Sequence, residues 1–209
     1  YCEEKKQRIE QLRDYDSFRE QLKEKKEQSL LKVEKASDKL HQIREKNSSA
    51  FSEAIRAQMS ELNFLDTRLE LRLTDTGHFS ANGRDEAEFY LSLNPGEPLK
   101  ALGNIASGGE LSRIMLAVKT VLADEEDTPT LIFDEIDAGI SGITAGKVAE
   151  KLRLIGKSRQ VICITHLPQI AAAADVHFLI KKEAGDGAVK TEISLLDEEQ
   201  SVGELARLL

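Results

Sequence analysis

The sequence predicts an α/β protein with a long helix at its N-terminal end. Residues 1–60 repeat apolar side chains at steps of three and four, and no glycine or proline occurs before Gly77. Further on, two short, continuously apolar runs at 130–133 and 161–164 alternate with helical patterns at about 109–123, 144–156 and 168–174. Such runs are typical of strands buried on both faces, as in a parallel sheet covered by helices.

The N-terminal repeat has the spacing of a coiled-coil seam. Nine of its thirteen positions are apolar or alanine. The thirteen are Leu12, Tyr15, Arg19, Leu22, Lys26, Ser29, Val33, Ala36, Leu40, Ile43, Asn47, Ala50 and Ala54. An apolar seam of this length is unfavourable in water, so we expect a covering helix from another copy or from another part of the protein. A solvated single helix with internal ion pairs is the alternative.

Composition narrows the classes of function. The chain has 29 basic and 37 acidic side chains; residues 1–60 hold 14 basic and 12 acidic ones, which leaves 15 and 25 for residues 61–209. The acidic second part is poorly suited to DNA phosphates. Cys2 and Cys163 provide neither a disulfide framework nor paired metal ligands, which predicts a reducing compartment. No run approaches the roughly 18 apolar residues of a membrane span. Because the chain starts without Met, we expect Tyr1 not to be the native beginning.

Other segments predict further strands, a break in regular structure, a hairpin and a last helix. Leu69, Leu71 and Leu73 alternate with the charged residues Arg68, Glu70 and Arg72. After a predicted turn around Gly77, Phe89, Leu91 and Leu93 again occupy every second position. The prolines and glycine of 94–98 break regular structure. We expect a closing hairpin of 176–181 and 189–195, joined at Gly185-Asp186-Gly187, and a last helix over 198–209.

A glycine-containing segment before an apolar helix is suited to binding phosphate. It runs Ile105-Ala106-Ser107-Gly108-Gly109-Glu110-Leu111-Ser112. Ser107 can cap the helix, and the two glycines let backbone N–H groups approach an anion that the helix dipole favours. A simple cap and turn is the alternative.

Two acids and a histidine follow the two buried strands. Asp134 and Glu135 stand at a strand end, where open α/β sheets place their ligands. Asp134 would coordinate Mg²⁺, and Glu135 would act as general base toward the attacking water. His166, after the next strand, stands where it would donate to a γ-phosphate or hold the attacking water. Solvated loop acids and a structural histidine are the alternatives.

Together these segments resemble those of ABC-type ATPase heads across about residues 95–170. Ser107-Gly108-Gly109-Glu110 is similar to the ABC signature, Asp134-Glu135 to the Walker B end, Asp137-Ala138-Gly139 to the D-loop, and His166 to the switch histidine. Four longer sequence segments resemble the RecN family of the SMC and ABC superfamily. They are Asn94-Pro95-Gly96-Glu97-Pro98-Leu99-Lys100, Ile105 to Leu116, Asp134 to Gly142 and Thr165-His166-Leu167-Pro168-Gln169-Ile170.

The resemblance implies a division of the chain and a set of roles. Residues 1–60 would form one strand of an antiparallel coiled-coil arm, and residues 61–209 the C-terminal lobe of an ABC ATPase head. The cofactors would be ATP and Mg²⁺. Glu135 and His166 would be catalytic and Asp134 the metal ligand, while Ser107, Gly108, Gly109, Glu110 and Asp137 would contact nucleotide.

The same resemblance implies partners and a compartment. The P-loop would lie in an N-terminal half of the same protein, and Ser107 would act on ATP held by a second head. DNA would bind the full-length protein, which would be bacterial, cytoplasmic and nucleoid-associated, without membrane contact. Within this chain, Gly146-Lys147 does not form a P-loop, because Ser141 and Val148 replace the required glycine and hydroxyl.

We therefore expect an ATPase of double-strand-break repair whose fragment is inactive alone. An SMC-like tethering component without significant ATPase activity is the alternative. A third possibility is an SMC-type repair ATPase with a zinc hook. No Cys-x-x-Cys occurs here, although a hook would lie in a part of the coil outside this sequence.

Overall fold

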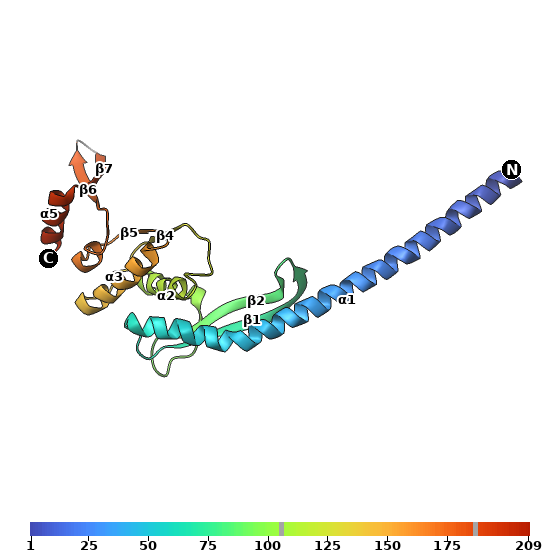
Figure 1. Ribbon diagram of the computed structural model, residues 1–209, viewed down its shortest axis with the longest axis horizontal. Helices are drawn as coiled ribbons and strands as arrows, with labels where there is room; N and C mark the ends of the chain where they lie inside the picture. The colour runs from blue at the N-terminus through green and yellow to red at the C-terminus, as the bar shows by residue number, and fades with distance from the viewer. Residues whose placement is uncertain (105–106, 186–187) are drawn as a thin grey trace. The chain divides into compact units, whose positions relative to one another are not determined.

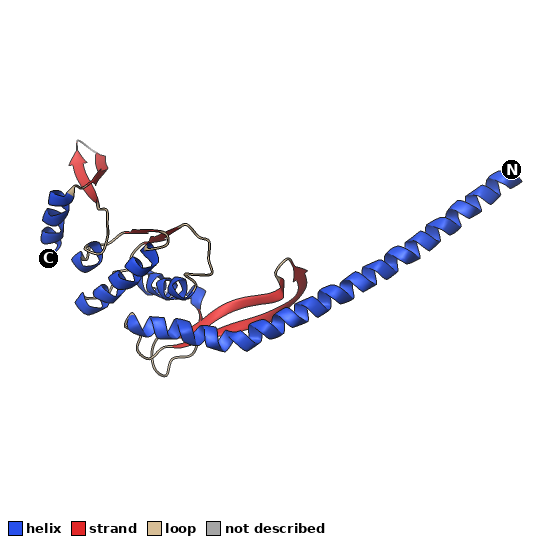
Figure 2. Ribbon diagram, in the orientation of Figure 1, coloured by secondary structure: helices blue, strands red, loops and turns tan. Residues whose placement is uncertain are grey.

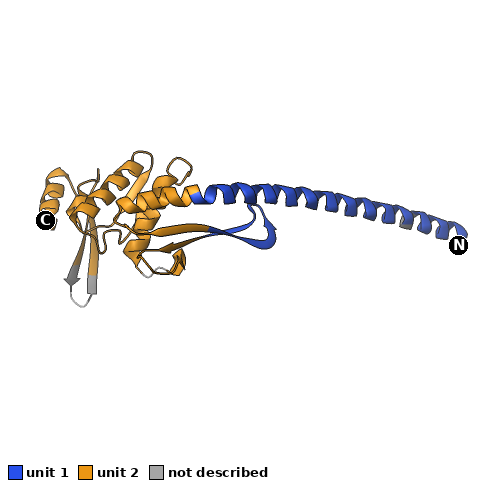
Figure 3. Cartoon of the chain, turned by 90° about the horizontal axis from the view of Figure 1, so that it is seen from below, with its two compact units in different colours: residues 1–49, 72–88 blue, residues 50–71, 89–209 orange. Residues whose placement is uncertain are grey.

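The computed structural model describes residues 1–104, 107–185 and 188–209. Ile105 and Ala106 of the signature-like segment, and the Asp186-Gly187 part of the predicted hairpin turn, lie outside the described residues. The side chains of residues 11–12 and 183–189 are likewise not described. The chain divides into two compact units, residues 1–49 with 72–88 and residues 50–71 with 89–209 (Figure 3).

The long N-terminal helix α1 extends over Cys2–Glu61 (Figure 1). The predicted helix is therefore confirmed. Large apolar side chains along it remain exposed, among them Tyr15 (63%), Phe18 (59%) and Leu22 (49%). These residues belong to or flank the predicted seam, and the described residues of this chain do not cover them.

In the first unit, the hairpin of β1 (Arg68–Ser80) and β2 (Gly83–Ser92) is joined to α1 by charged side chains. The Asp85 carboxylate lies 2.8 Å from His41 Nδ1 and accepts from Arg44 at 2.9 Å. Arg84 pairs with Asp38 at 2.9 Å. Gly83 is required by this close approach, because a Cβ there would lie 3.0 Å from Leu40 Cδ2 and the backbone has φ +89°.

The predicted turn around Gly77 is wrong. Strand β1 continues through Gly77 to Ser80, and the turn lies at Ala81 and Asn82. Gly77 has φ +71°, and its N–H donates to Asp75 Oδ1 at 2.8 Å. A glycine with positive φ inside a strand is typical of a bulge, so the glycine marks a distortion of the strand rather than its end.

The second unit contains the hydrophobic core. The last turns of α1 contribute Ile55 and Met59, and Leu62 follows directly after the helix; each is at most 1% exposed. They share the core with α2 (Gly108–Val121), β4 (Thr130–Phe133) and α3 (Gly142–Gly156). Lys151 of α3 is 7% exposed and donates to Gln58 and, at 2.8 Å, to Glu61. The apolar contacts and this buried lysine hold the end of α1 against α3.

Three small sheets are present among the described residues (Figure 2). β1, β2 and the short β3 (Lys100–Ala101) form the first, with η1 (Leu102–Asn104) following. β4 pairs in parallel with β5 (Gln160–Cys163), and β6 (Phe178–Gly185) pairs antiparallel with β7 (Ala188–Leu195). Helices α4 (Pro168–Ala171) and α5 (Glu198–Leu208) flank the last sheet in sequence. The α/β alternation is confirmed, although α4 is shorter than predicted.

One expectation about the parallel strands is corrected. Burial on both faces was predicted, yet Leu131 and Phe133 are buried while the alternate residue Ile132 is 67% exposed. Ile162 and Ile164 of the β5 segment are 44% and 48% exposed. Successive side chains of a strand point to opposite faces, so one face of this strand pair is packed and the other is exposed.

Candidate functional site

The signature-like segment begins helix α2 as the sequence predicted. Ser107 is the N-cap, with extended backbone, and its side chain accepts from the Glu110 N–H at 3.4 Å. Glu110 is half-buried in the first turn, and its charge favours the protonated form of Arg113. The helix start therefore has the cap expected of an anion-binding terminus.

The start of α2 lies against the loop after β4. A Cβ on Gly108 would meet Glu135 Oε2, the end of an exposed side chain that can move aside. On Gly109, which is buried, a Cβ would lie 2.8 Å from the Cβ of Ala138 and 2.9 Å from the Glu135 carbonyl oxygen. The backbone contact at Gly109 leaves no room for a side chain. Gly109 therefore serves close packing here.

The two acids stand where β4 ends, and both are exposed. Asp134 Oδ1 accepts from the Glu135 N–H at 2.8 Å, and the Asp134 carbonyl oxygen accepts from Ser112 Oγ at 2.7 Å. Glu135 has φ +55°, a left-handed conformation that is uncommon for a residue with a side chain. Strain of this kind persists only where the surroundings impose it, and it is common at functional sites.

Arg113 holds the loop that carries these acids, and the sequence motifs did not single it out. Its side chain is only 6% exposed, and its guanidinium donates to the carbonyl oxygens of Ile136 (3.2 Å) and Ala138 (2.8 Å). It also lies 5.5 Å from the centroid of the Phe64 ring. Burial lowers the pKa of Arg113. The sequence could have indicated this role, because an arginine on the apolar face of a predicted helix is a buried charge that needs hydrogen-bond partners.

Asp137 and His166 meet at the ends of the parallel strands. Asp137 is 5% exposed, and its Oδ2 accepts from Thr165 Oγ1 at 2.6 Å and from the His166 backbone N–H at 2.8 Å. His166 Nδ1 lies 3.0 Å from the same oxygen, while the imidazole is 74% exposed. Burial alone would raise the pKa of Asp137, but the Thr165 and His166 hydrogen bonds and the nearby imidazole hold it below its ordinary value.

Asp134 and Asp137 make the electrostatic potential around Cys163 negative. Burial raises the pKa of the Cys163 thiol to about 12, and the charges of Asp137 and Asp134 add to that effect. The thiol therefore stays protonated and is not a nucleophile. ATP phosphates would be repelled here unless cations accompany them. Lys147 of the Gly146-Lys147 pair lies within α3 and pairs with Glu150 at 3.3 Å, as expected of a surface lysine.

Among the described residues, no group of three or more His, Cys, Asp or Glu side chains has a metal-binding arrangement. Mg²⁺ at phosphate sites needs only one or two carboxylates, with phosphate and water oxygens completing its shell. Asp134 is exposed at a strand end with one oxygen held by the Glu135 N–H, so its position and donor type fit such an ion. No helix of the described residues is long and apolar enough to cross a membrane.

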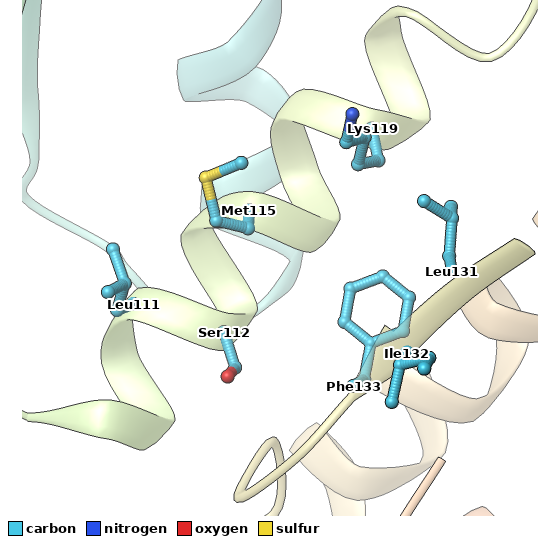
Figure 4. Close-up of a pocket in the computed structure, with 7 residues that line it drawn as sticks. All are labelled: Leu111, Ser112, Met115, Lys119, Leu131, Ile132 and Phe133. Atoms are coloured by element: carbon cyan, nitrogen blue, oxygen red, sulfur yellow. The ribbon is translucent and has the colours of Figure 1, made fainter. Parts of the chain in front are cut away.

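A pocket of about 310 Å³ lies beside these residues and contains none of the predicted acids or His166. Figure 4 shows Leu111, Ser112, Met115 and Lys119 of α2 facing Leu131, Ile132 and Phe133 of β4. Its lining is mostly apolar, which does not suit a triphosphate. The structure thus gathers the predicted residues in two groups elsewhere: Gly108 and Gly109 with Glu135, and Asp137 with His166.

Comparison with solved structures identifies the class of fold. The chain is similar to the Smc head domain with a coiled coil and joint derived from Pyrococcus yayanosii, with a TM-score of 0.54 and 22% identity over 76% of this chain and 29% of that chain. At that identity the likeness concerns the fold alone. The chain has the fold of an SMC head of the ABC ATPase type, preceded by a long helix, and the predicted fold class is confirmed.

Sequence comparison finds relatives that share the name DNA repair protein RecN. The chain is 44% identical to DNA repair protein RecN of Halalkalibacterium halodurans over 193 residues, which are 90% of this chain and 34% of the relative. It is 43% identical to that of Vibrio cholerae over 175 residues, 83% of this chain and 32% of the relative. None of the protein-family models matches the chain. The chain spans about a third of the length of the curated relatives it matches. Its resemblance to the C-terminal part of RecN is confirmed.

Proposed function

We propose that this chain is the C-terminal part of an SMC-like ATPase that acts in recombinational repair of DNA double-strand breaks. The main observation is that one lobe gathers a capped, glycine-containing helix start, two acids at a strand end and a histidine held at the next strand end. The relatives are DNA repair proteins by name, which supports the biological role. Residues 1–60 would serve as the coiled-coil arm and residues 61–209 as the lobe.

The chemistry follows from where charges develop during ATP hydrolysis. Mg²⁺, held by Asp134, would supply neutralisation of the phosphate charge. Glu135 would accept the proton of the attacking water, and His166 would orient that water or contact the γ-phosphate. Ser107, Gly108, Gly109 and Glu110 would present the helix start to ATP bound by a second head, and the D-loop residue Asp137 would lie at the interface between heads. Turnover would then depend on pairing of the heads.

The exposed apolar face supports a second partner, the N-terminal half of the same protein. Ile132 and Ile162 are 67% and 44% exposed on adjacent parallel strands, and Ile164, directly after β5, is 48% exposed. Covering such residues stabilises a complex by about 1.5–3 kcal/mol for each side chain that becomes fully buried. The N-terminal half would cover this face and bring the P-loop that ATP needs. It would also supply the second helix that covers the exposed seam of α1.

The test compares variants of the complete protein that contains this chain. Glu135→Gln should lower ATP turnover by at least about 100-fold, because the amide cannot accept the proton. It should also let ATP hold head dimers, measured by light scattering. Glu150→Gln, an exposed acid in α3, is the control and should leave turnover unchanged.

Each other outcome has a definite meaning. Unchanged turnover in Glu135→Gln would remove that residue from the role of base. Absence of ATP turnover in the wild-type protein, with and without DNA, would favour the tethering component instead. DNA binding, nucleoid association and a cytoplasmic location are parts of the proposal that localisation and binding assays on the complete protein would check.

A further inference from the structure

Helix α2 holds the loop after β4 by its backbone carbonyl groups. Ser112 Oγ donates to the carbonyl oxygen of Asp134 at 2.7 Å. Arg113 Nη1 donates to the carbonyl oxygen of Ile136 at 3.2 Å. These two acceptors belong to the residues directly before and after Glu135. Two neighbouring side chains of α2 therefore hold the backbone on both sides of that acid.

Glu135 has a backbone conformation that its own side chain does not explain. Its φ of +55° lies in the left-handed region, which is disfavoured for a residue with a Cβ. The side chain is exposed, so its burial cannot impose this conformation. Such a conformation persists only where the surrounding contacts impose it. The bonds from α2 to the neighbouring carbonyl groups are contacts of this kind.

The carbonyl group of Glu135 is fixed as well. Its oxygen accepts from the Ala138 N–H at 3.0 Å. It also lies against α2, because a Cβ on Gly109 would be only 2.9 Å from it. The carbonyl groups of three consecutive residues, 134–136, are therefore held in place, and each has a different hydrogen-bond donor.

Arg113 is a rigid donor. Its side chain is 6% exposed, and Nη1 makes a second bond, to the carbonyl oxygen of Ala138 at 2.8 Å. The guanidinium carbon lies 5.5 Å from the centroid of the Phe64 ring, a distance at which a cation and an aromatic face attract each other. A buried donor that lost its acceptors would be left unsatisfied, which is unfavourable. A change of conformation at Glu135 would therefore strain or break the bonds from Arg113.

We propose that Ser112 and Arg113 are positioning residues that hold Glu135 in its left-handed conformation and so aim its carboxylate at the attacking water. The catalytic meaning of this proposal rests on the ATPase function proposed above. A change of φ from positive to negative would turn the Cα–Cβ bond and carry the carboxylate elsewhere. A general base must lie within hydrogen-bond reach of the proton that it accepts. Ser112 and Arg113 would act through the backbone of the loop, without touching ATP themselves.

The direct test is NMR spectroscopy of the 209-residue chain, labelled with ¹³C and ¹⁵N at glutamate. The Glu135 signals are assigned by their loss in Glu135→Gln. The one-bond Cα–Hα coupling and the backbone chemical shifts of residue 135 distinguish a positive φ from a negative one. The wild-type chain should show a positive φ, and Arg113→Met a negative one. A negative φ in the wild type, or a positive one in Arg113→Met, would overturn the proposal.

Two further variants complete this test. Ser112→Ala is milder, because it removes one hydroxyl of a half-buried residue and keeps the buried arginine. It should shift the Glu135 signals toward those of a negative φ, and it decides the outcome if Arg113→Met does not fold; unchanged signals would contradict the proposal. Thr120→Val is the matched control, since its hydroxyl donates at 2.7 Å to the Leu116 carbonyl oxygen within α2. The Glu135 signals should not change in Thr120→Val.

ATP turnover by the complete protein separates positioning of the base from support of the helix start. Arg113→Met should lower kcat by about 100-fold, because the base is displaced. Ser112→Ala should lower it by about 10-fold, the effect of one hydrogen bond. KM for ATP should change little in both. Arg153→Met, at an exposed arginine of α3, is the control and should leave kcat and KM unchanged. A raised KM with unchanged kcat would overturn the catalytic part of the proposal.

A double variant shows whether Arg113 acts through Glu135. In a Glu135→Gln background, Arg113→Met should lower turnover by less than about 3-fold further, because the base that it positions is already absent. A further loss of about 100-fold would show that Arg113 acts independently of Glu135 and would contradict the proposal. If the wild-type protein does not hydrolyse ATP, the proposed function fails, and the NMR result alone then decides whether Ser112 and Arg113 hold Glu135.

Discussion

The two compact units of this chain are stabilised by different interactions. In the unit of residues 1–49 and 72–88, the contacts between α1 and the hairpin are largely ionic, centred on Asp85 with His41 and Arg44. In the unit of residues 50–71 and 89–209, apolar side chains such as Leu116 and Ile155 are almost fully buried. The second unit therefore has an apolar core of its own, whereas the first is held together by charged contacts and leaves large apolar side chains of α1 exposed.

The largest expected effect concerns the lobe core. Leu116→Ala should destabilise the lobe by about 3 kcal/mol, because it leaves a cavity at a side chain that is 0% exposed. Leu111→Ala on the same helix, at 37% exposure, is the control and should cost much less. Hydrogen exchange of α3 peptides measures both. If Leu116→Ala also opened the hairpin of residues 72–88, the two units would not be separable.

The next effect concerns the ionic contacts of the arm. Asp85→Ala should destabilise the hairpin by about 2 kcal/mol, because it removes the carboxylate that pairs with Arg44 and His41. Water can still reach both cations, which limits the loss. Hydrogen exchange of peptides from 75–88 should rise, while exchange in α3 stays constant. Glu86→Ala, at the adjacent exposed position, is the control. Equal exchange in the two variants would show that the ionic cluster does not hold the hairpin.

Acid should weaken the ionic contacts between α1 and the hairpin of residues 72–88. Burial would raise the pKa of Asp85, but hydrogen bonds from Arg44 and His41 outweigh it and hold the pKa below the ordinary 3.8. A depressed pKa means that the stabilisation is present above the ordinary value and is lost as pH falls through the folded-state pKa. NMR spectra of residues 82–85 should therefore change at low pH. Asp85→Asn should not show this transition, and a persistent one would assign it to another group.

The smallest effect concerns the exposed seam. Leu22→Ser should change the stability of this chain by less than about 0.5 kcal/mol, because Leu22 is 49% exposed and the substitution removes little buried area. The same substitution in the complete protein should destabilise the coiled-coil arm clearly, as measured by thermal unfolding. A large effect in this chain alone would mean that its own copies already cover the seam.

Local patterns predicted the elements well because they depend on near neighbours. The repeat of residues 1–60 gave helix α1, and the Ser107 cap with its two glycines gave the start of α2. The turn predicted around Gly77 was wrong, because glycines with positive φ occur in strand bulges as well as in turns. Periodicity cannot distinguish these two uses.

Features that depend on distant partners could not be predicted. Ile132 is apolar, so its strand was expected to be buried on both faces, but burial depends on what covers the sheet and not on the strand's own sequence. The Asp137 contact with His166 joins residues from two strand ends, and their spacing along the chain does not indicate which atoms meet. The role of Arg113 could not be predicted either, because its hydrogen-bond acceptors are carbonyl oxygens of a loop more than twenty residues further along the chain.

We propose that this chain carries catalytic groups of an ATPase but not the cradle for ATP. Isothermal titration calorimetry of Mg²⁺-ATP against the purified 209-residue chain, together with a phosphate-release assay, tests this proposal. We expect no micromolar binding and no turnover, because the acidic strand ends repel phosphate and the sequence contains no complete P-loop motif. Micromolar binding with Mg²⁺-dependent hydrolysis by the chain alone would contradict it.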